Sequence, residues 1–143
     1  MNSFWIGGLL LIVIVGTVNS QQKNQQVTDY LIENGYLQES YTKHELRRAL
    51  RQLQRENNLT ISGRISSQTI DFIQTENNRQ MVLDYLKTFG YIQGSITPLK
   101  TTNAIKQLQQ NSGSLSITGF IDTPTVEFIK NHPQAYSEGL MSS

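Results

Sequence analysis

Residues 49–54 read ALRQLQ, and residues 104–109 read AIKQLQ, 55 positions further along the chain. In each copy a threonine, Thr42 or Thr97, stands seven positions before the alanine. Apolar residues spaced by three and four positions form one stripe of an amphipathic helix, and threonine is a favoured N-cap. The two stretches therefore predict the same helix at the centre of two repeated structural units.

Matching segments flank both copies of this helix. Upstream, residues 27–35 and 82–90 each carry apolar residues at helical spacing and end on a glycine, which favours a helix stop. Downstream, residues 59–65 (LTISGRI) and 115–121 (LSITGFI) predict a short extended piece and a turn. Ser66 and Asp122 then stand as caps of a third helix. We predict an all-α chain with unit 1 at 27–76, unit 2 at 81–132 and a short link at 75–80.

The N-terminus carries a targeting signal. Residues 5–18 (WIGGLLLIVIVGTV) are uncharged and apolar, but too short to span a bilayer, which needs about 20 residues. Val18 and Ser20, at the −3 and −1 positions, predict a signal peptide at 1–20, cut between Ser20 and Gln21; an uncleaved anchor is the alternative. We expect a secreted, extracellular chain without stable membrane insertion, with a flexible polar lead-in at 21–26 and a flexible tail at 133–143.

The amino-acid composition argues against several classes of function. The 143 residues include 12 basic and 11 acidic residues, so the whole chain has no field that would attract nucleic acid. Cysteine is absent, which removes thiol catalysis and thiolate metal sites. The two histidines, His44 and His132, fall in different copies, whereas zinc needs about three or four clustered ligands. We therefore predict a protein that is not an enzyme and has no metal or cofactor.

The order of these motifs, found twice, resembles a peptidoglycan-binding-like domain, in the version found in the propeptides of matrix metalloproteinases. The resemblance rests on residues 85–92, 104–109, 115–122 and 125–129 and on their counterparts in the first copy. There Ser62 and Ser66 replace the family's usual threonine and aspartate. The resemblance covers residues 27–132 and implies two tandem closed three-helix bundles. It also implies either cell-wall attachment or latency control of a metalloproteinase.

The chain departs from both branches of that family. A metalloproteinase propeptide continues into a Pro-Arg-Cys-Gly segment that occupies the catalytic zinc, but residues 130–134 read KNHPQ. The Asp-Gly-rich loop of bacterial versions is reduced to QGS at 93–95. Our leading prediction is a secreted binding module for peptidoglycan, another glycan or an extracellular protein. The alternatives are a degenerate or detached propeptide-like regulator of a metalloproteinase, without the cysteine switch, and a structural extracellular protein.

One basic run is a candidate binding site. Arg47, Arg51 and Arg55 are spaced by four positions on one helix face, and Arg48 lies beside them. The planar fork of arginine suits carboxylate and phosphate, so an anionic glycan or an acidic protein surface could bind here. The alternative is an ordinary solvated face, paired with nearby glutamates. The counterparts in the second copy are Thr102, Asn103, Lys106 and Gln110.

Three further features are assigned from the sequence. Gln54 and Gln109 end the central stripe in both copies, and we interpret them as structural amides that bind loop backbone. The tyrosines of both units are interpreted as core and rim residues. Asn58 begins the sequon Asn-Leu-Thr, which predicts N-glycosylation in a eukaryotic cell.

Overall fold

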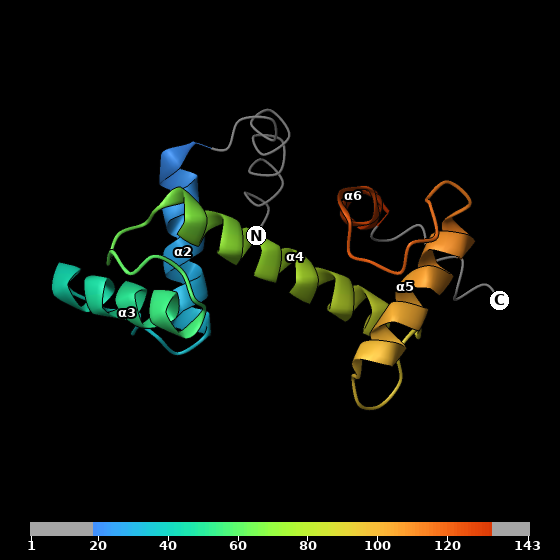
Figure 1. Ribbon diagram of the computed structural model, residues 1–143, viewed down its shortest axis with the longest axis horizontal. Coiled ribbons are helices and arrows are strands. Elements are labelled where there is room, and N and C mark those ends of the chain that lie inside the picture. The colour runs from blue at the N-terminus through green and yellow to red at the C-terminus, as the bar shows by residue number, and fades with distance from the viewer. Residues whose placement is uncertain (1–18, 133–143) are drawn as a thin grey trace, which may run out of the picture. The chain divides into compact units, whose positions relative to one another are not determined.

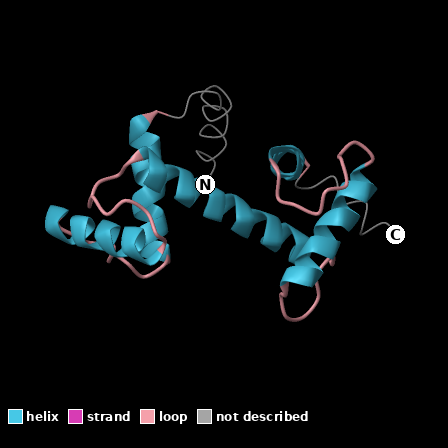
Figure 2. Ribbon diagram, in the orientation of Figure 1, coloured by secondary structure: helices cyan, strands magenta, loops and turns pink. Residues whose placement is uncertain are grey.

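The computed structural model describes residues 19–132, and throughout this part of the chain the protein is all-α (Figure 1). Loops connect five helices there, and no strand is present between these residues (Figure 2). The chain divides into two compact units, Met1–Gln74 and Thr75–Ser143. The helices are α2 (Ser20–Glu33), α3 (Lys43–Glu56), α4 (Ser67–Thr88), α5 (Pro98–Ser112) and α6 (Thr123–Asn131).

Helices α3 and α5, the central helices of the two units, begin where the sequence predicted. The Thr42 hydroxyl accepts a hydrogen bond from the Glu45 N–H at 3.2 Å, and the Glu45 carboxylate accepts from the Thr42 N–H at 2.8 Å. Together these bonds form a capping box. Thr97 caps α5 by accepting from the Lys100 N–H at 3.2 Å. Pro98 fills the first helical position, where its missing N–H is not needed.

The third predicted helix start is also confirmed in both units. The Ser66 hydroxyl accepts from the Thr69 N–H at 3.2 Å, immediately before α4. The Asp122 carboxylate accepts from the Thr125 N–H at 3.0 Å and caps α6. Serine and aspartate are interchangeable here because either side chain supplies an oxygen to a free N–H of the first turn.

Residues 21–26 differ from the sequence prediction, since they form the first turns of α2 instead of a flexible lead-in. Asn19 and Gln22 form a capping box, with the Gln22 N–H donating to the Asn19 side chain at 2.9 Å. Gln25 then donates to Asp29, one turn later, at 2.8 Å. Polar pairs at this spacing stabilise a helix without any apolar periodicity. The predicted signal peptide lies outside the described residues except for Asn19 and Ser20, and the predicted tail at 133–143 lies wholly outside them.

Residues 75–80, predicted as a link, are helical and lie within the unbroken α4. Their sequence, TENNRQ, contains neither glycine nor proline to stop a helix. Glu76 and Arg79 form an ion pair at 3.1 Å, and Gln80 donates to Asp84 at 2.9 Å. These pairs at i, i+3 and i, i+4 favour continued helix. The first part of α4 therefore belongs to unit 1 and the remainder to unit 2.

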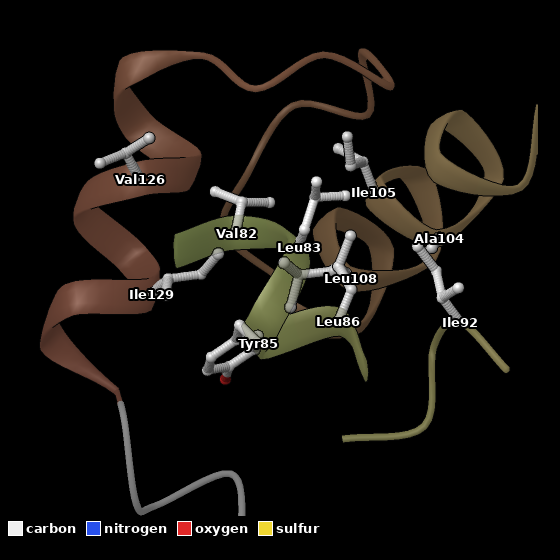
Figure 3. Close-up of a cluster of buried hydrophobic side chains, with 10 residues drawn as sticks. All are labelled: Val82, Leu83, Tyr85, Leu86, Ile92, Ala104, Ile105, Leu108, Val126 and Ile129. Atoms are coloured by element: carbon white, nitrogen blue, oxygen red, sulfur yellow. The ribbon is translucent and has the colours of Figure 1, made fainter. Parts of the chain in front are cut away.

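Each unit has its own core, centred on the predicted stripe of its middle helix. Leu53 in α3 and Leu108 in α5 are both fully buried, and the adjacent stripe residues Ala49, Leu50, Ala104 and Ile105 are buried as well. Figure 3 shows that side chains from α4, α5 and α6 meet around Leu108 in unit 2. The core of unit 1 consists of Val27, Leu31, Leu37, Ala49, Leu50, Leu53 and Ile73.

We expect Leu53→Ala and Leu108→Ala each to lower the free energy of unfolding by about 2–5 kcal/mol, because each leaves a cavity in a small core. Leu99→Ala is the control, since Leu99 is 71 % exposed, and it should change stability by no more than about 0.5 kcal/mol. Thermal unfolding measures all three. Unchanged melting of both core variants would show that these helices are not the centres of their units.

Candidate functional site

A buried glutamine clamps a loop against the middle helix of unit 1. Gln54 is fully buried, and its carbonyl oxygen accepts from the N–H groups of Ser62 at 2.9 Å and Gly63 at 3.0 Å. Its amide nitrogen donates to the Arg64 carbonyl at 3.0 Å and to the Thr69 hydroxyl at 3.1 Å, with a longer contact of 3.3 Å to the Ser62 hydroxyl. The amide thus has no unsatisfied hydrogen-bonding group, and the predicted structural role of Gln54 is confirmed.

Gln109 repeats this clamp in unit 2. Its carbonyl oxygen accepts from the N–H groups of Thr118 at 2.8 Å and Gly119 at 2.9 Å. Its nitrogen donates to the Thr118 hydroxyl, the Phe120 carbonyl and the Thr125 hydroxyl, at 3.0, 3.2 and 3.0 Å. Two sequences that differ at most positions therefore hold the same loop by the same five bonds.

The clamped loop turns at a glycine that lies against the outer side of the middle helix. Gly63 and Gly119 have φ angles of +71° and +79°, which other residues rarely adopt. A Cβ atom on Gly63 would lie 3.0 Å from Nε of Arg51, and one on Gly119 would lie 3.0 Å from Cε of Lys106. The basic side chain at this helix position therefore extends over the turn in both units.

The structure places Arg47, Arg51 and Arg55 on the exposed face of α3, as the sequence predicted. Arg48 is also exposed, but its Nη2 atom lies 3.4 Å from Nε2 of His44, and the side chain lines a hollow beside Gly35. None of the four arginines forms an ion pair within 4.0 Å of a carboxylate in residues 19–132. The face is therefore solvated but not neutralised by direct pairing.

The two glutamates of α3 are engaged with other groups. Hydrogen bonds from the backbone and the side chain of Thr42 hold the pKa of Glu45 below its ordinary value. Glu56 accepts from Gln52 at 3.0 Å and from the Tyr36 hydroxyl at 2.7 Å, and these bonds lower its pKa as well. Burial, together with the bond to Glu56, raises the pKa of Tyr36 to about 12. Both carboxylates remain charged at neutral pH, but neither pairs directly with an arginine.

Sequence reasoning missed a fifth arginine, Arg64. Arg64 directly follows Gly63, the glycine that Arg51 lies against, and its carbonyl is bound by Gln54. The side chain of Arg64 is exposed. Comparison of the two copies could have found it, because Phe120 occupies the same position after the turn glycine of unit 2. A position that accepts both arginine and phenylalanine is expected to face outward.

The corresponding positions of unit 2 hold Thr102, Asn103, Lys106, Gln110 and Phe120, so this face has one basic residue and lies beside an apolar groove. Phe120 is 72 % exposed and borders a groove of about 450 Å³ between α4, the start of α5 and the clamped loop. Thr101 and Thr97 also line the groove, but the Thr101 hydroxyl donates to the Thr97 carbonyl at 2.9 Å. The apolar lining consists of Leu83, Ile96, Pro98, Ile105, Phe120 and Ile121.

Other predicted features can be located in the structure. Asn58 is exposed directly after α3, with a positive φ of 57°, and its glycosylation stays a prediction. The predicted cleavage site between Ser20 and Gln21 falls at the first turn of α2. Nδ1 of His132 donates to the Phe128 carbonyl at 2.8 Å, and its ring stacks on that of Phe128 at 4.3 Å.

Two further kinds of feature are absent from the part of the chain that the structure describes. Between residues 19 and 132, no three His, Asp or Glu side chains gather as ligands for a metal ion. None of the helices α2–α6 has both the length and the apolar character needed to cross a membrane.

Comparison with known proteins finds similarity to a viral protein but shows no family. The chain is 50 % identical over 66 residues to Uncharacterized protein 114L of Invertebrate iridescent virus 3. The match covers 46 % of this chain and 46 % of that protein, so the chain spans about half the length of the relative. No family model matches the sequence. No solved structure matches it.

We expect Gln54→Leu to destabilise unit 1 by about 1–3 kcal/mol for each buried N–H that loses its acceptor. Gln52→Leu is the matched control, because Gln52 is exposed on the same helix and should change stability by no more than about 0.5 kcal/mol. Urea unfolding measures the difference. Equal stability of the two variants would rule out the clamp as a source of stability.

Asp122 makes the clamp of unit 2 sensitive to acid. Burial alone would raise the pKa of Asp122, but hydrogen bonds from Thr125 and Thr118 outweigh it and hold the pKa below the ordinary value of 3.8. A carboxyl with a lowered folded pKa stabilises the fold above its ordinary pKa and loses that contribution as the pH falls through the folded pKa.

We therefore expect Asp122→Ser, which copies Ser66 of unit 1, to reduce the loss of melting temperature between about pH 5 and about pH 2.5. Differential scanning calorimetry of both proteins at the two pH values checks this. Other carboxyls, including Glu45, contribute equally to both proteins and cancel in the comparison. An identical loss in the two proteins would contradict a stabilising charge on Asp122.

Proposed function

We propose that this protein is a secreted, non-catalytic binding module made of two tandem peptidoglycan-binding-like units. Its ligand is an extracellular glycan, a cell-wall polymer or a protein. The observation that carries the proposal is the contrast between a constant interior and a variable face. Both units keep the glutamine clamp and the turn glycine, whereas the outward positions around them change from Arg47 and Arg64 to Thr102 and Phe120.

Buried positions also change between the units, as from Leu50 to Ile105, but the changes of charge lie on the outer face. Interior residues are restricted by packing and by the need to satisfy buried polar groups, so their identity reports on the fold. Outer residues carry no such restriction, and their chemistry reports on what they contact. Unit 1 offers guanidinium groups that form no ion pair within residues 19–132, and unit 2 offers an apolar groove, which are two different binding chemistries on one scaffold.

The order of segments in each unit supports the family resemblance. A helix that ends at a glycine, a capped middle helix, a glycine turn and a second capped helix occur in the same sequence twice. Unit 1 uses α2, α3 and the start of α4, and unit 2 uses the rest of α4 with α5 and α6.

Sedimentation with insoluble polymers tests the proposal. We expect the purified protein to be retained by insoluble peptidoglycan or chitin, or by a defined extracellular protein, and not to inhibit a matrix metalloproteinase in a peptide-cleavage assay. The alternative, a propeptide-like regulator, requires the opposite pattern, with inhibition and no retention. Failure of every polymer and protein to retain the chain would refute the binding-module proposal.

A further inference from the structure

We infer that the exposed arginines of α3 and of the loop clamped against it, Arg47, Arg51, Arg55 and Arg64, bind the sulfate and carboxylate groups of an anionic polysaccharide. This inference rests on the proposed function and names the ligand class of that module. Arg48 is left out because it lies toward His44, beside the hollow near Gly35.

Positive charge is concentrated on α3 and not spread over the chain. The formal net charge of the protein is only +1, yet α3 carries five basic and two acidic residues. Those two acids, Glu45 and Glu56, bind the helix cap and the Tyr36 hydroxyl. Arginines four positions apart on one helix repel one another, so this face gains from any anion that binds to it.

The fold does not need these arginines. In unit 2 the positions of Arg47, Arg55 and Arg64 hold Thr102, Gln110 and Phe120, and the clamp and core are nevertheless the same. A structural role therefore does not explain these arginines, whereas binding to an external ligand does.

The spacing of the arginines fits a linear ligand. A helix rises about 1.5 Å per residue, so Arg47, Arg51 and Arg55 form a row about 12 Å long with steps of about 6 Å. A single small anion would contact one or two of them, whereas a chain with a charge on successive sugars can contact all three. Arg51 already lies over Gly63, so it loses less conformational freedom on binding.

The residue types around the row favour a polysaccharide over other polyanions. Helix α3 has no aromatic side chain, so it lacks the stacking platform used for single-stranded nucleic acid. Protein interfaces usually centre on a buried apolar or aromatic anchor, and the exposed face of α3 has none. A bilayer that held the chain by insertion would require apolar side chains on that face, and the exposed face of α3 has none. What remains is recognition by charge-assisted hydrogen bonds from guanidinium groups, which suits sulfate and carboxylate.

Binding of the full chain to heparin, with dextran as the neutral control, tests the inference. We expect heparin to bind with an affinity that falls as salt rises, and dextran not to bind. The double variant Arg51→Gln/Arg64→Gln should weaken heparin binding by about tenfold or more, as loss of two charge-assisted contacts predicts. Lys100→Gln/Lys106→Gln in unit 2 removes the same charge from the other unit and should leave the affinity within about twofold.

A second variant separates binding from folding. Arg51→Lys/Arg64→Lys keeps the charge, and lysine already extends over the equivalent glycine in unit 2. It should melt as the wild type does and bind heparin with intermediate affinity, because lysine lacks the bidentate fork.

Four outcomes would overturn the inference. These are no heparin binding, equal binding by the wild type and the Arg51→Gln/Arg64→Gln variant, equal weakening by the unit 2 control, or preference for polyglutamate, which would indicate an acidic protein partner. Retention on peptidoglycan or chitin without heparin binding would refute this inference and leave the proposed function standing. Loss of all binding would refute both.

Discussion

The structure of each unit depends on one buried amide, Gln54 or Gln109. The loop after the middle helix has backbone N–H groups that no helix or strand pairs, and leaving them buried without an acceptor would cost about 1–3 kcal/mol each. The glutamine carbonyl supplies that acceptor to two successive residues, and its nitrogen reaches the next carbonyl and the first turn of the third helix. One side chain therefore joins three segments that a small core alone would hold weakly.

This arrangement explains why the outer faces can differ. Gln54 lies on the inner side of α3, so its bonds place no demand on the exposed positions of the helix. The turn glycine makes one steric demand, which is a side chain flexible enough to extend over it, and Arg51 and Lys106 both satisfy that demand. The other outward positions are free to differ, and they change from arginine in unit 1 to neutral residues such as Thr102 and Phe120 in unit 2.

Local chemistry accounts for what the sequence predicted. Caps such as Thr42 and Asp122, and the stripes that contain Leu53 and Leu108, are determined within one or two helical turns and were confirmed. Residues 21–26 were predicted wrongly because their helix depends on polar pairs without an apolar pattern. Arg64 was missed because the helical pattern of α3 does not reach it: the Gln54 clamp holds its backbone from ten positions away, and only comparison with Phe120 in the second copy marks its position. The groove bordered by Phe120 is likewise formed by three separate segments.

The energetic consequences of the two faces also differ. Like charges at i, i+4 on a helix cost about 0.2–0.5 kcal/mol per pair, so the row from Arg47 to Arg55 slightly destabilises α3 in the absence of a ligand. A small unit has little stability to spare, and a ligand that binds only the folded state adds stability that grows with the logarithm of its concentration above Kd. A polyanion would remove the repulsion and add charge-assisted bonds at the same time. The face of unit 2 has no such repulsion to relieve, so ligand-dependent stabilisation by anions should be confined to unit 1.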